Sequence, residues 1–340
     1  MDIKIVAAKL DQTYMDEFCS FQQKYSDKKF SKGFLPPQVW RQFLVQTPEP
    51  MANFWLAYLG DRPAGRIGAS LMPSHKGLGS IGFFELDTSH KRYGDIAQSL
   101  LKQATSWLKS RSCHKAVGPM NLNTWFPYRF RSDEEVKRRY SWEPIHPQSY
   151  LDEWLGYGFS VNARYKAFNT GELGKFVATT QGAYEHCLSE GYHFRDFDAE
   201  YFFDRDIPIL YEMSMECFKD NHLFEPISLE AFKSLYVPIA DKMDHSLGQI
   251  CFAKDGSPAG FGFSFIDDDA FVVKTLATMP QHRGHGISNA LAYIAGTTAY
   301  ERGMRSYITA IIHAGAQSES YGKKGELIWE HNYDLLEIEF

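Results

Sequence analysis

The fold of this chain is decided by the stretch Met279-Pro280-Gln281-His282-Arg283-Gly284-His285-Gly286-Ile287-Ser288. It follows an alternating segment typical of a strand and leads directly into a segment with helical spacing. Its two glycines, Gly284 and Gly286, let backbone N–H groups approach a ligand closely, because no side chain stands in the way. The N-terminus of the following helix adds a partial positive charge. The stretch therefore predicts a small anion cradle suited to phosphate or pyrophosphate.

The composition of the 340 residues is that of a folded protein with a sizeable core. Hydrophobic residues make up 44% of the chain and aromatic residues 15%, and the length favours two domains over one. The formal net charge is −6, and no run of Lys or Arg exceeds an ordinary solvated face. These features argue against a nucleic-acid partner.

Cysteine usage and the absence of targeting signals favour a cytoplasmic protein. The first six residues lack the charged-then-apolar pattern of a signal peptide, and no apolar run is long enough to span a membrane. The five cysteines are scattered, and none forms a CxxC pair. We therefore expect a reducing environment, no membrane association and no zinc site.

The same order of expected elements occurs twice along the chain. Each half starts with a strand and two helices, continues with a two-stranded hairpin and a fourth strand, and ends with a helix and a fifth strand. The first set covers 3–7, 13–25, 38–44, 54–59, 66–71, 82–86, 96–109 and 115–117, and the second covers 192–197, 209–218, 229–236, 250–253, 261–265, 271–278, 288–302 and 306–313.

Matching positions in the two sets keep a near-constant offset. The tripeptides Pro63-Ala64-Gly65 and Pro258-Ala259-Gly260 lie 195 positions apart, and Leu100 and Leu291 in the following helices lie 191 apart. One small insertion or deletion between hairpin and helix accounts for the difference. A shared order with such an offset is the signature of a duplicated domain.

The boundary between the two copies is expected just before a connecting helix. Residues 175–190, between Gly174 and Gly191, predict that helix. The expected domains are therefore residues 1–173 and residues 174–340.

The two copies of the turn differ where an anion would bind. The first copy places Arg92-Tyr93-Gly94-Asp95-Ile96-Ala97 over residues 283–288, so that Tyr93 replaces Gly284 and Asp95 replaces Gly286. At roughly 4 Å and an effective dielectric near 20, the Asp95 carboxylate would repel a phosphate charge by about 4 kcal/mol. We expect the first copy to be a scaffold that binds no phosphorylated cofactor.

The turn and its setting resemble the acyl-CoA-binding core of the GNAT N-acetyltransferase superfamily. That family's motif, Arg/Gln-x-x-Gly-x-Gly/Ala, is matched by Arg283-x-x-Gly286-x-Ser288, with Ser288 departing from the last position. The residues 150–159 (YLDEWLGYGF) are similar to the family's late Tyr…Gly-Phe helix end. The resemblance implies an α+β (mixed α/β) fold of two tandem GNAT-like domains, the first degenerate. Each would have a mostly antiparallel central sheet flanked by helices.

This resemblance implies a binding mode for acetyl-CoA or another acyl-CoA. Backbone N–H groups from Arg283 through Gly284, His285, Gly286 and Ile287 to Ser288 would hold the pyrophosphate. Ala277 and Thr278, at the strand end, would hydrogen-bond the pantetheine arm as an added strand would. The next strand, ending at His313, would splay away and leave a gap for the thioester. An amine would then attack the acyl carbonyl directly.

The resemblance also implies a tyrosine acid, on the helix after the fifth strand. Tyr321 is the candidate in Ser318-Glu319-Ser320-Tyr321, although the asparagine that the family usually places upstream is not evident. A phenol is well matched to protonating a thiolate in a dry site. Packing or capping is the alternative role.

The general base is less well defined, because the strand 271–278 carries no carboxylate. His313 is the preferred candidate, ahead of Glu225 and His222, since it ends a strand that faces the expected gap. Asp267-Asp268-Asp269 predicts a polar hairpin turn rather than a metal site, and Ser288 lacks the partners of a nucleophile.

Three functions are consistent with these residues. The preferred one is an N-acyltransferase acting on an amine of a small molecule or a peptide. A non-catalytic acyl-CoA-binding module is the second. The third takes the acyl group from an acyl-carrier protein, for which the only nearby cations are Lys323, Lys324, Arg302 and Arg305. We expect a monomer, since many single-domain relatives pair up and this chain carries its partner in cis.

Overall fold

A computed structural model describes residues 2–25, 35–48, 50–133, 139–316, 318–322 and 324–340. The chain divides into two compact units. Unit 1 comprises Met1–Arg164, Leu223–Glu225 and Tyr333–Phe340, and unit 2 comprises Tyr165–His222 and Pro226–Asn332. Each unit has a mostly antiparallel sheet flanked by helices, which confirms the expected mixed α and β fold class. The boundary at residue 173 stays a prediction about the duplicated sequence.

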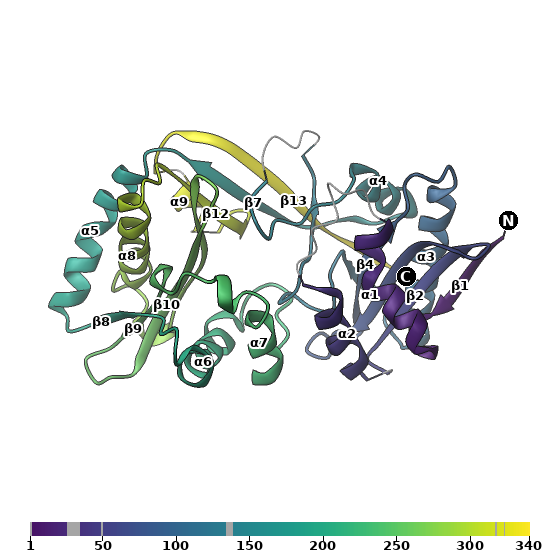
Figure 1. The fold of residues 1–340 in the computed structure, drawn as a ribbon, viewed down its shortest axis with the longest axis horizontal. Coiled ribbons are helices and arrows are strands. Elements are labelled where there is room, and N and C mark those ends of the chain that lie inside the picture. Colours follow the sequence, from purple (N-terminus) through teal and green to yellow (C-terminus); the bar gives the residue numbers. More distant parts are fainter. Residues whose placement is uncertain (1, 26–34, 49, 134–138, 317, 323) are drawn as a thin grey trace. The chain divides into compact units, whose positions relative to one another are not determined.

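In unit 1 the sheet order is β1-β2-β3-β4-β5-β13, and β4 and β5 are parallel. The expected strands and helices of the first half are all present (Figure 1). The elements are β1 (Ile3–Ala7), a 3₁₀ turn (Ala8–Leu10), α1 (Gln12–Tyr25), α2 (Pro37–Gln46), β2 (Ala52–Leu59), β3 (Arg62–Leu71), β4 (Leu78–Leu86), α3 (Tyr93–Ser110), β5 (Lys115–Gly118), β6 (Phe130–Arg131) and α4 (Gln148–Tyr157).

In unit 2 the sheet order is β7-β12-β11-β10-β9-β8, and β11 and β12 are parallel. The elements are α5 (Leu173–Ser189), β8 (His193–Asp196), a π-helical turn (Phe202–Asp206), α6 (Ile207–Phe218), α7 (Leu229–Tyr236), 3₁₀ turns (Ala240–Lys242, His245–Leu247 and Pro280–His282), β9 (Gly248–Phe252), β10 (Pro258–Asp267), β11 (Ala270–Thr278), α8 (Ile287–Glu301), β12 (Ser306–His313) and α9 (Glu319–Gly322). The turn between β10 and β11 is the polar hairpin expected at Asp267-Asp268-Asp269.

Two strands that the sequence analysis did not predict complete the sheets. The last residues of β13 (Leu327–Glu339) pair with β5 in unit 1, from Leu336↔Gly118 to Glu339↔Lys115. The last residues of β7 (Ser160–Thr170) pair with β12 in unit 2. Each unit's sheet therefore includes a strand from a segment that follows the other copy in the sequence.

The core of unit 2 lies on both faces of its sheet. An added Cβ at Gly262 would lie 3.4 Å from Leu291, so this face of β10 meets α8. On the opposite face the Phe261 ring contacts Phe218 of α6, and Phe263 contacts Tyr236 of α7. Helix α5 packs beside α8 (Figure 1).

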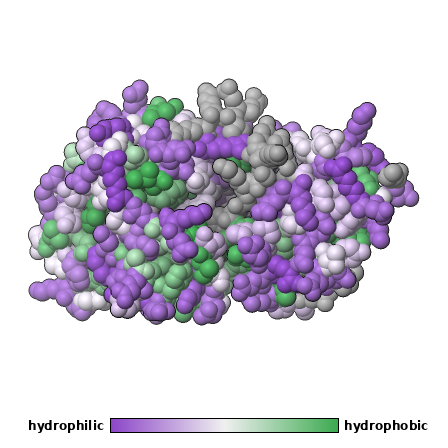
Figure 2. Space-filling model, viewed as in Figure 1, coloured by the Kyte–Doolittle hydropathy of each residue, from purple (hydrophilic) through white to green (hydrophobic). Residues whose placement is uncertain are grey.

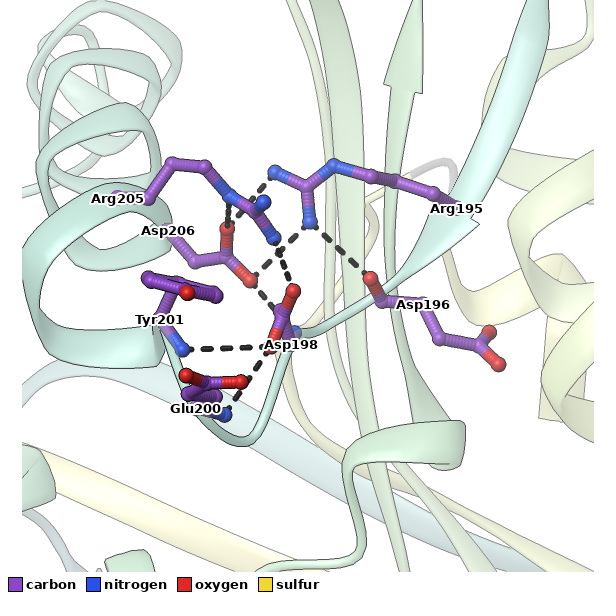
Figure 3. Close-up of polar contacts among 7 residues, drawn as sticks. All are labelled: Arg195, Asp196, Asp198, Glu200, Tyr201, Arg205 and Asp206. Atoms are coloured by element: carbon purple, nitrogen blue, oxygen red, sulfur yellow. Dashed lines mark hydrogen bonds and ion pairs between the residues drawn. The ribbon is translucent and has the colours of Figure 1, made fainter.

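A buried ion cluster fixes the start of α6 in unit 2 (Figure 3). The carboxylate of Asp206, which is fully buried, accepts hydrogen bonds from Arg195 at 2.7 and 3.1 Å and from Arg205 at 3.1 Å. It also accepts from the Asp198 backbone N–H at 2.8 Å. The cluster therefore joins the end of β8 to the π-helical turn.

Hydrophilic side chains predominate on the face of the molecule in Figure 2, with apolar residues scattered among them. None of the helices in the described ranges has the length and apolar character needed to cross a membrane.

Candidate functional site

The turn after β11 forms an open loop of positive-φ glycines in front of α8. Gly284 has φ +93° and Gly286 has φ +83°, conformations that residues with a Cβ adopt only with strain. An added Cβ at Gly284 would meet nothing within 4 Å. Within the described part of the chain, the N–H groups of residues 284–289 form no hydrogen bond. Six amide donors are therefore available at the positive end of a helix, an arrangement able to bind an anion.

The hydroxyl of Ser288 is engaged within this turn. It lies 2.9 Å from the Thr278 hydroxyl, which joins the end of β11 to the first turn of α8. This contact gives Ser288 a structural role at the motif position where the family usually has glycine or alanine.

The corresponding turn of the first copy is closed. Helix α3 begins at Tyr93, so Tyr93, Gly94 and Asp95 form its first turn instead of a loop. The Arg92 side chain donates to the Asp95 carboxylate over 2.8 Å. The residues that replace the two glycines thus remove the cradle itself, besides adding a negative charge.

A gap opens between β11 and β12 beside the turn. The parallel pairing of the two strands ends at Val273↔Thr309, although β11 continues to Thr278. A bulge at Lys274 displaces β11, since Thr275 pairs with Phe263 and Val273 with Ser264. The edge that carries Ala277 and Thr278 therefore faces the gap, in line with the expected splay.

The equivalent strand edge in unit 1 is occupied by the chain's own tyrosine. The pairing of β4 with β5 ends at Ser80↔Val117. Beyond it, the hydroxyl of buried Tyr150 accepts from the Leu86 N–H at 2.7 Å and donates to the Leu86 carbonyl at 3.0 Å. Leu86 lies 191 positions before Ala277. Tyr150 thus satisfies the backbone groups that a pantetheine arm would use, a second physical reason to expect no cofactor there.

Tyr321 lies on α9 and packs on the face of the sheet covered by α5. Its ring centroid is 6.1 Å from that of Phe176, and its carbonyl accepts from the Tyr307 hydroxyl at 2.7 Å. Burial raises the pKa of Tyr321 to about 12, so the phenol keeps its proton at neutral pH. A retained proton fits an acid, and the same ring contacts fit a packing role.

His313 is exposed at the end of β12, next to another of the candidate bases. Its ring centroid lies 6.2 Å from that of His222, which follows α6, and 5.1 Å from that of Tyr165. The third candidate, Glu225, belongs to unit 1, where its two carboxylate oxygens accept from the N–H and the hydroxyl of Ser74, each at 2.8 Å. The structure therefore brings two histidines together and places Glu225 elsewhere.

Residues from the connecting helix contact the turn, which the sequence analysis did not predict. Glu190 and Cys187 bind the side chain and the carbonyl of His285. Beside them lies a pocket of about 610 Å³, lined by Glu190, Tyr192, Ala253, Lys254, Asp255 and His285.

Of the residues singled out in the sequence, Lys323 lies outside the described residues. The described ranges contain no group of three side chains able to hold a metal ion.

Comparison with known proteins yields a match of fold, not of sequence. No protein-family model and no curated protein matches this chain. The GCN5-related glucosamine N-acetyltransferase region of a fungal multi-domain GH3 β-N-acetylglucosaminidase is similar to it with a TM-score of 0.60 and 12% identity. That match covers 99% of this chain and 38% of the fungal one, so this chain spans well under half of that protein.

Two further solved structures are similar over almost their entire lengths. A tandem GNAT protein from the clavulanic acid biosynthesis pathway has a TM-score of 0.57 and 10% identity, over 99% of this chain and 98% of its own. A GCN5-related N-acetyltransferase from Sphaerobacter thermophilus has a TM-score of 0.52 and 14% identity, over 99% and 95%. This chain therefore has the fold of the GCN5-related N-acetyltransferases, present twice in tandem.

Proposed function

We propose that the second copy is an N-acyltransferase that transfers an acyl group from acetyl-CoA or another acyl-CoA to an amine. The observation that carries this proposal is the turn of residues 284–288, where free amide donors meet a strand edge opened by the splay of β12. A cradle for pyrophosphate next to an edge for an extended amide arm fits coenzyme A better than a simple phosphate.

The cofactor would be held almost entirely by backbone groups. The N–H of Arg283, one of the expected donors, donates to the Pro280 carbonyl at 3.3 Å. Amides of residues 284–288 would therefore bind the pyrophosphate, and Ala277 and Thr278 would pair with the pantetheine amides. The thioester would then lie in the gap between β11 and β12. A side-chain carboxylate at the cradle would oppose this binding, and the described turn carries none.

The reaction would proceed by direct attack within a ternary complex. The neutral amine attacks the thioester carbonyl, an N–H on the open edge of β11 stabilises the oxyanion, and the C–S bond then breaks. His313 would take the amine proton, with His222 beside it, and Tyr321 would protonate the leaving thiolate. We propose that the enzyme acts as a cytoplasmic monomer on a small-molecule or peptide amine.

One molecule of coenzyme A is expected to bind per chain. Calorimetric titration with CoA and a series of acyl-CoAs measures this stoichiometry, and release of free thiol in the presence of amines measures transfer. Two sites per chain would contradict the scaffold role of the first copy. Binding without thiol release from any amine would favour a non-catalytic module.

Replacing Tyr321 with phenylalanine is expected to lower turnover about a hundredfold, since general acids contribute roughly 10²–10⁴-fold. Affinity for CoA should change little, because the hydroxyl acts on the leaving group. Steady-state kinetics with thiol detection would measure both. The matched control is Tyr300→Phe, at a partly exposed tyrosine on α8. Equal turnover in Tyr321→Phe and Tyr300→Phe would remove Tyr321 as the acid.

A further inference from the structure

The turn of the candidate site is fastened to one face of the connecting helix. Oε2 of Glu190 lies 2.5 Å from Nδ1 of His285, and the Cys187 thiol donates to the His285 carbonyl over 3.3 Å. An added Cβ at Gly286 would lie 3.3 Å from the Cβ of Ala183. Positions 183, 187 and 190 have the spacing of one helix face, so this side of α5 backs the turn.

These contacts hold His285, the residue between the positive-φ glycines Gly284 and Gly286. Such a loop has many accessible conformations, and ordering it on binding would cost affinity. Because α8 begins only after Gly286, which has φ +83°, the His285 carbonyl accepts from the Cys187 thiol and not from the N–H of Asn289. That amide is left available to a ligand.

The pKa of Glu190 indicates which of the two side chains, Glu190 or His285, donates the hydrogen bond. The hydrogen bond from His285 holds the pKa of the Glu190 carboxyl below its usual range, so the group is an ionised acceptor. Nδ1 of His285 therefore carries the proton that is shared. His186 lies 3.7 Å from the other Glu190 oxygen, and the Tyr192 ring lies 5.7 Å from that of His285.

We propose that Glu190 is a positioning residue for the anion cradle, which it holds through His285 in the conformation that leaves the amides of residues 284–289 free. The proposal rests on the proposed function for its cofactor, but the cradle alone can be tested with inorganic pyrophosphate. If the Glu190 carboxylate acted only through its negative charge, its removal would change anion affinity in the opposite direction. Removing a carboxylate near an anion site should tighten anion binding, whereas loss of positioning should weaken it.

Glu190→Ala is expected to weaken binding of both CoA and inorganic pyrophosphate about tenfold in calorimetric titrations. Glu190→Gln keeps an acceptor oxygen and should recover part of the affinity. The matched control is Glu185→Ala on the same helix, where the carboxylate binds exposed Gln181. In kinetics, Glu190→Ala should raise KM for acyl-CoA and leave kcat unchanged. The ¹⁵N spectrum of labelled histidine should show loss of the hydrogen-bonded Nδ1 proton of His285.

Unchanged or tighter pyrophosphate binding by Glu190→Ala would overturn the positioning role, as would an unchanged His285 signal. A wild-type protein that binds pyrophosphate but not CoA would overturn the proposed function and leave the role of Glu190 standing. Failure of the wild type to bind either ligand would overturn both.

Discussion

Gly286→Asp is expected to abolish binding of coenzyme A by the second copy. The substitution introduces the residue that the first copy carries at this position, Asp95. A carboxylate roughly 4 Å from the pyrophosphate, at an effective dielectric near 20, costs about 4 kcal/mol. That cost corresponds to a loss of about a thousandfold in affinity.

The place of Gly286 at the start of α8 adds to the loss of CoA affinity. It also favours a folded variant. Gly286 is the N-cap of α8, and aspartate is among the preferred N-cap residues. The new carboxylate would accept from N–H groups of the first helical turn, which are the donors that the pyrophosphate needs. The helix is therefore stabilised at its start while the cradle loses its donors. The positive φ and the contact with Ala183 oppose this with a cost of about 1–2 kcal/mol.

Calorimetric titration with CoA would measure the change, and Gly286→Ala would separate the steric part from the charge. The matched control is Gly256→Asp, at a glycine with φ +85° in the β9–β10 turn where an added Cβ meets nothing within 4 Å. If Gly286→Asp binds CoA within about threefold of the control, the cofactor site lies elsewhere.

The repeat and the turn could be predicted from the sequence because their signals are local. Amphipathic spacing, hairpin turns and the pair of glycines each lie within one short segment. The near-constant offset between the copies then indicated the shared order of elements without any knowledge of packing.

Strands β7 and β13 could not be assigned in this way, because their partners are distant in sequence. From Trp329 to Leu335, β13 does alternate between buried and partly exposed positions, with Trp329, His331, Tyr333 and Leu335 all buried. That pattern is typical of a strand. Even so, alternation does not reveal that Leu336–Glu339 pair with β5, more than two hundred residues earlier.

Side-chain contacts at the turn of the second copy, and at the corresponding strand edge of the first copy, could likewise not be predicted from the sequence. Nothing local indicates that Tyr150 hydrogen-bonds the edge of β4, or that Glu190 binds His285. Both contacts depend on how a helix packs against the sheet or the turn. The contrast between Gly286 and Asp95 was visible in the sequence, but the helical start at Tyr93 that closes the first turn was not.

Asp206→Ala is expected to destabilise unit 2 by about 3 kcal/mol. Removing one partner of a buried ion cluster typically costs 3–5 kcal/mol, because the remaining charges lose their compensation. Here the two guanidinium groups can partly reach water, since the Arg195 side chain is 29% and the Arg205 side chain 44% exposed. The cost should therefore fall near the lower end, with the unpaired Asp198 N–H contributing to it.

The side chain of Asp206 connects three segments, so its loss should destabilise the whole of unit 2 and not only one turn. It accepts from Arg195 on β8, from Arg205 on the π-helical turn and from the backbone between them (Figure 3). Asn at this position keeps the shape but turns an NH₂ group toward a guanidinium donor. Asp206→Asn should therefore be nearly as destabilising as Asp206→Ala.

Urea unfolding followed by circular dichroism would measure the shift, with Asp204→Ala as the matched control. Asp204 lies on the same π-helical turn, its side chain is 88% exposed, and its nearest cation, Lys233, is 3.9 Å away. Such a surface pair contributes roughly 0–1 kcal/mol, so the control should unfold almost as the wild type does. A midpoint for Asp206→Ala equal to that of Asp204→Ala would show that the cluster does not stabilise the unit. A large shift shared by Asp206→Asn would show that the charge, and not the packing of the side chain, joins β8 to α6.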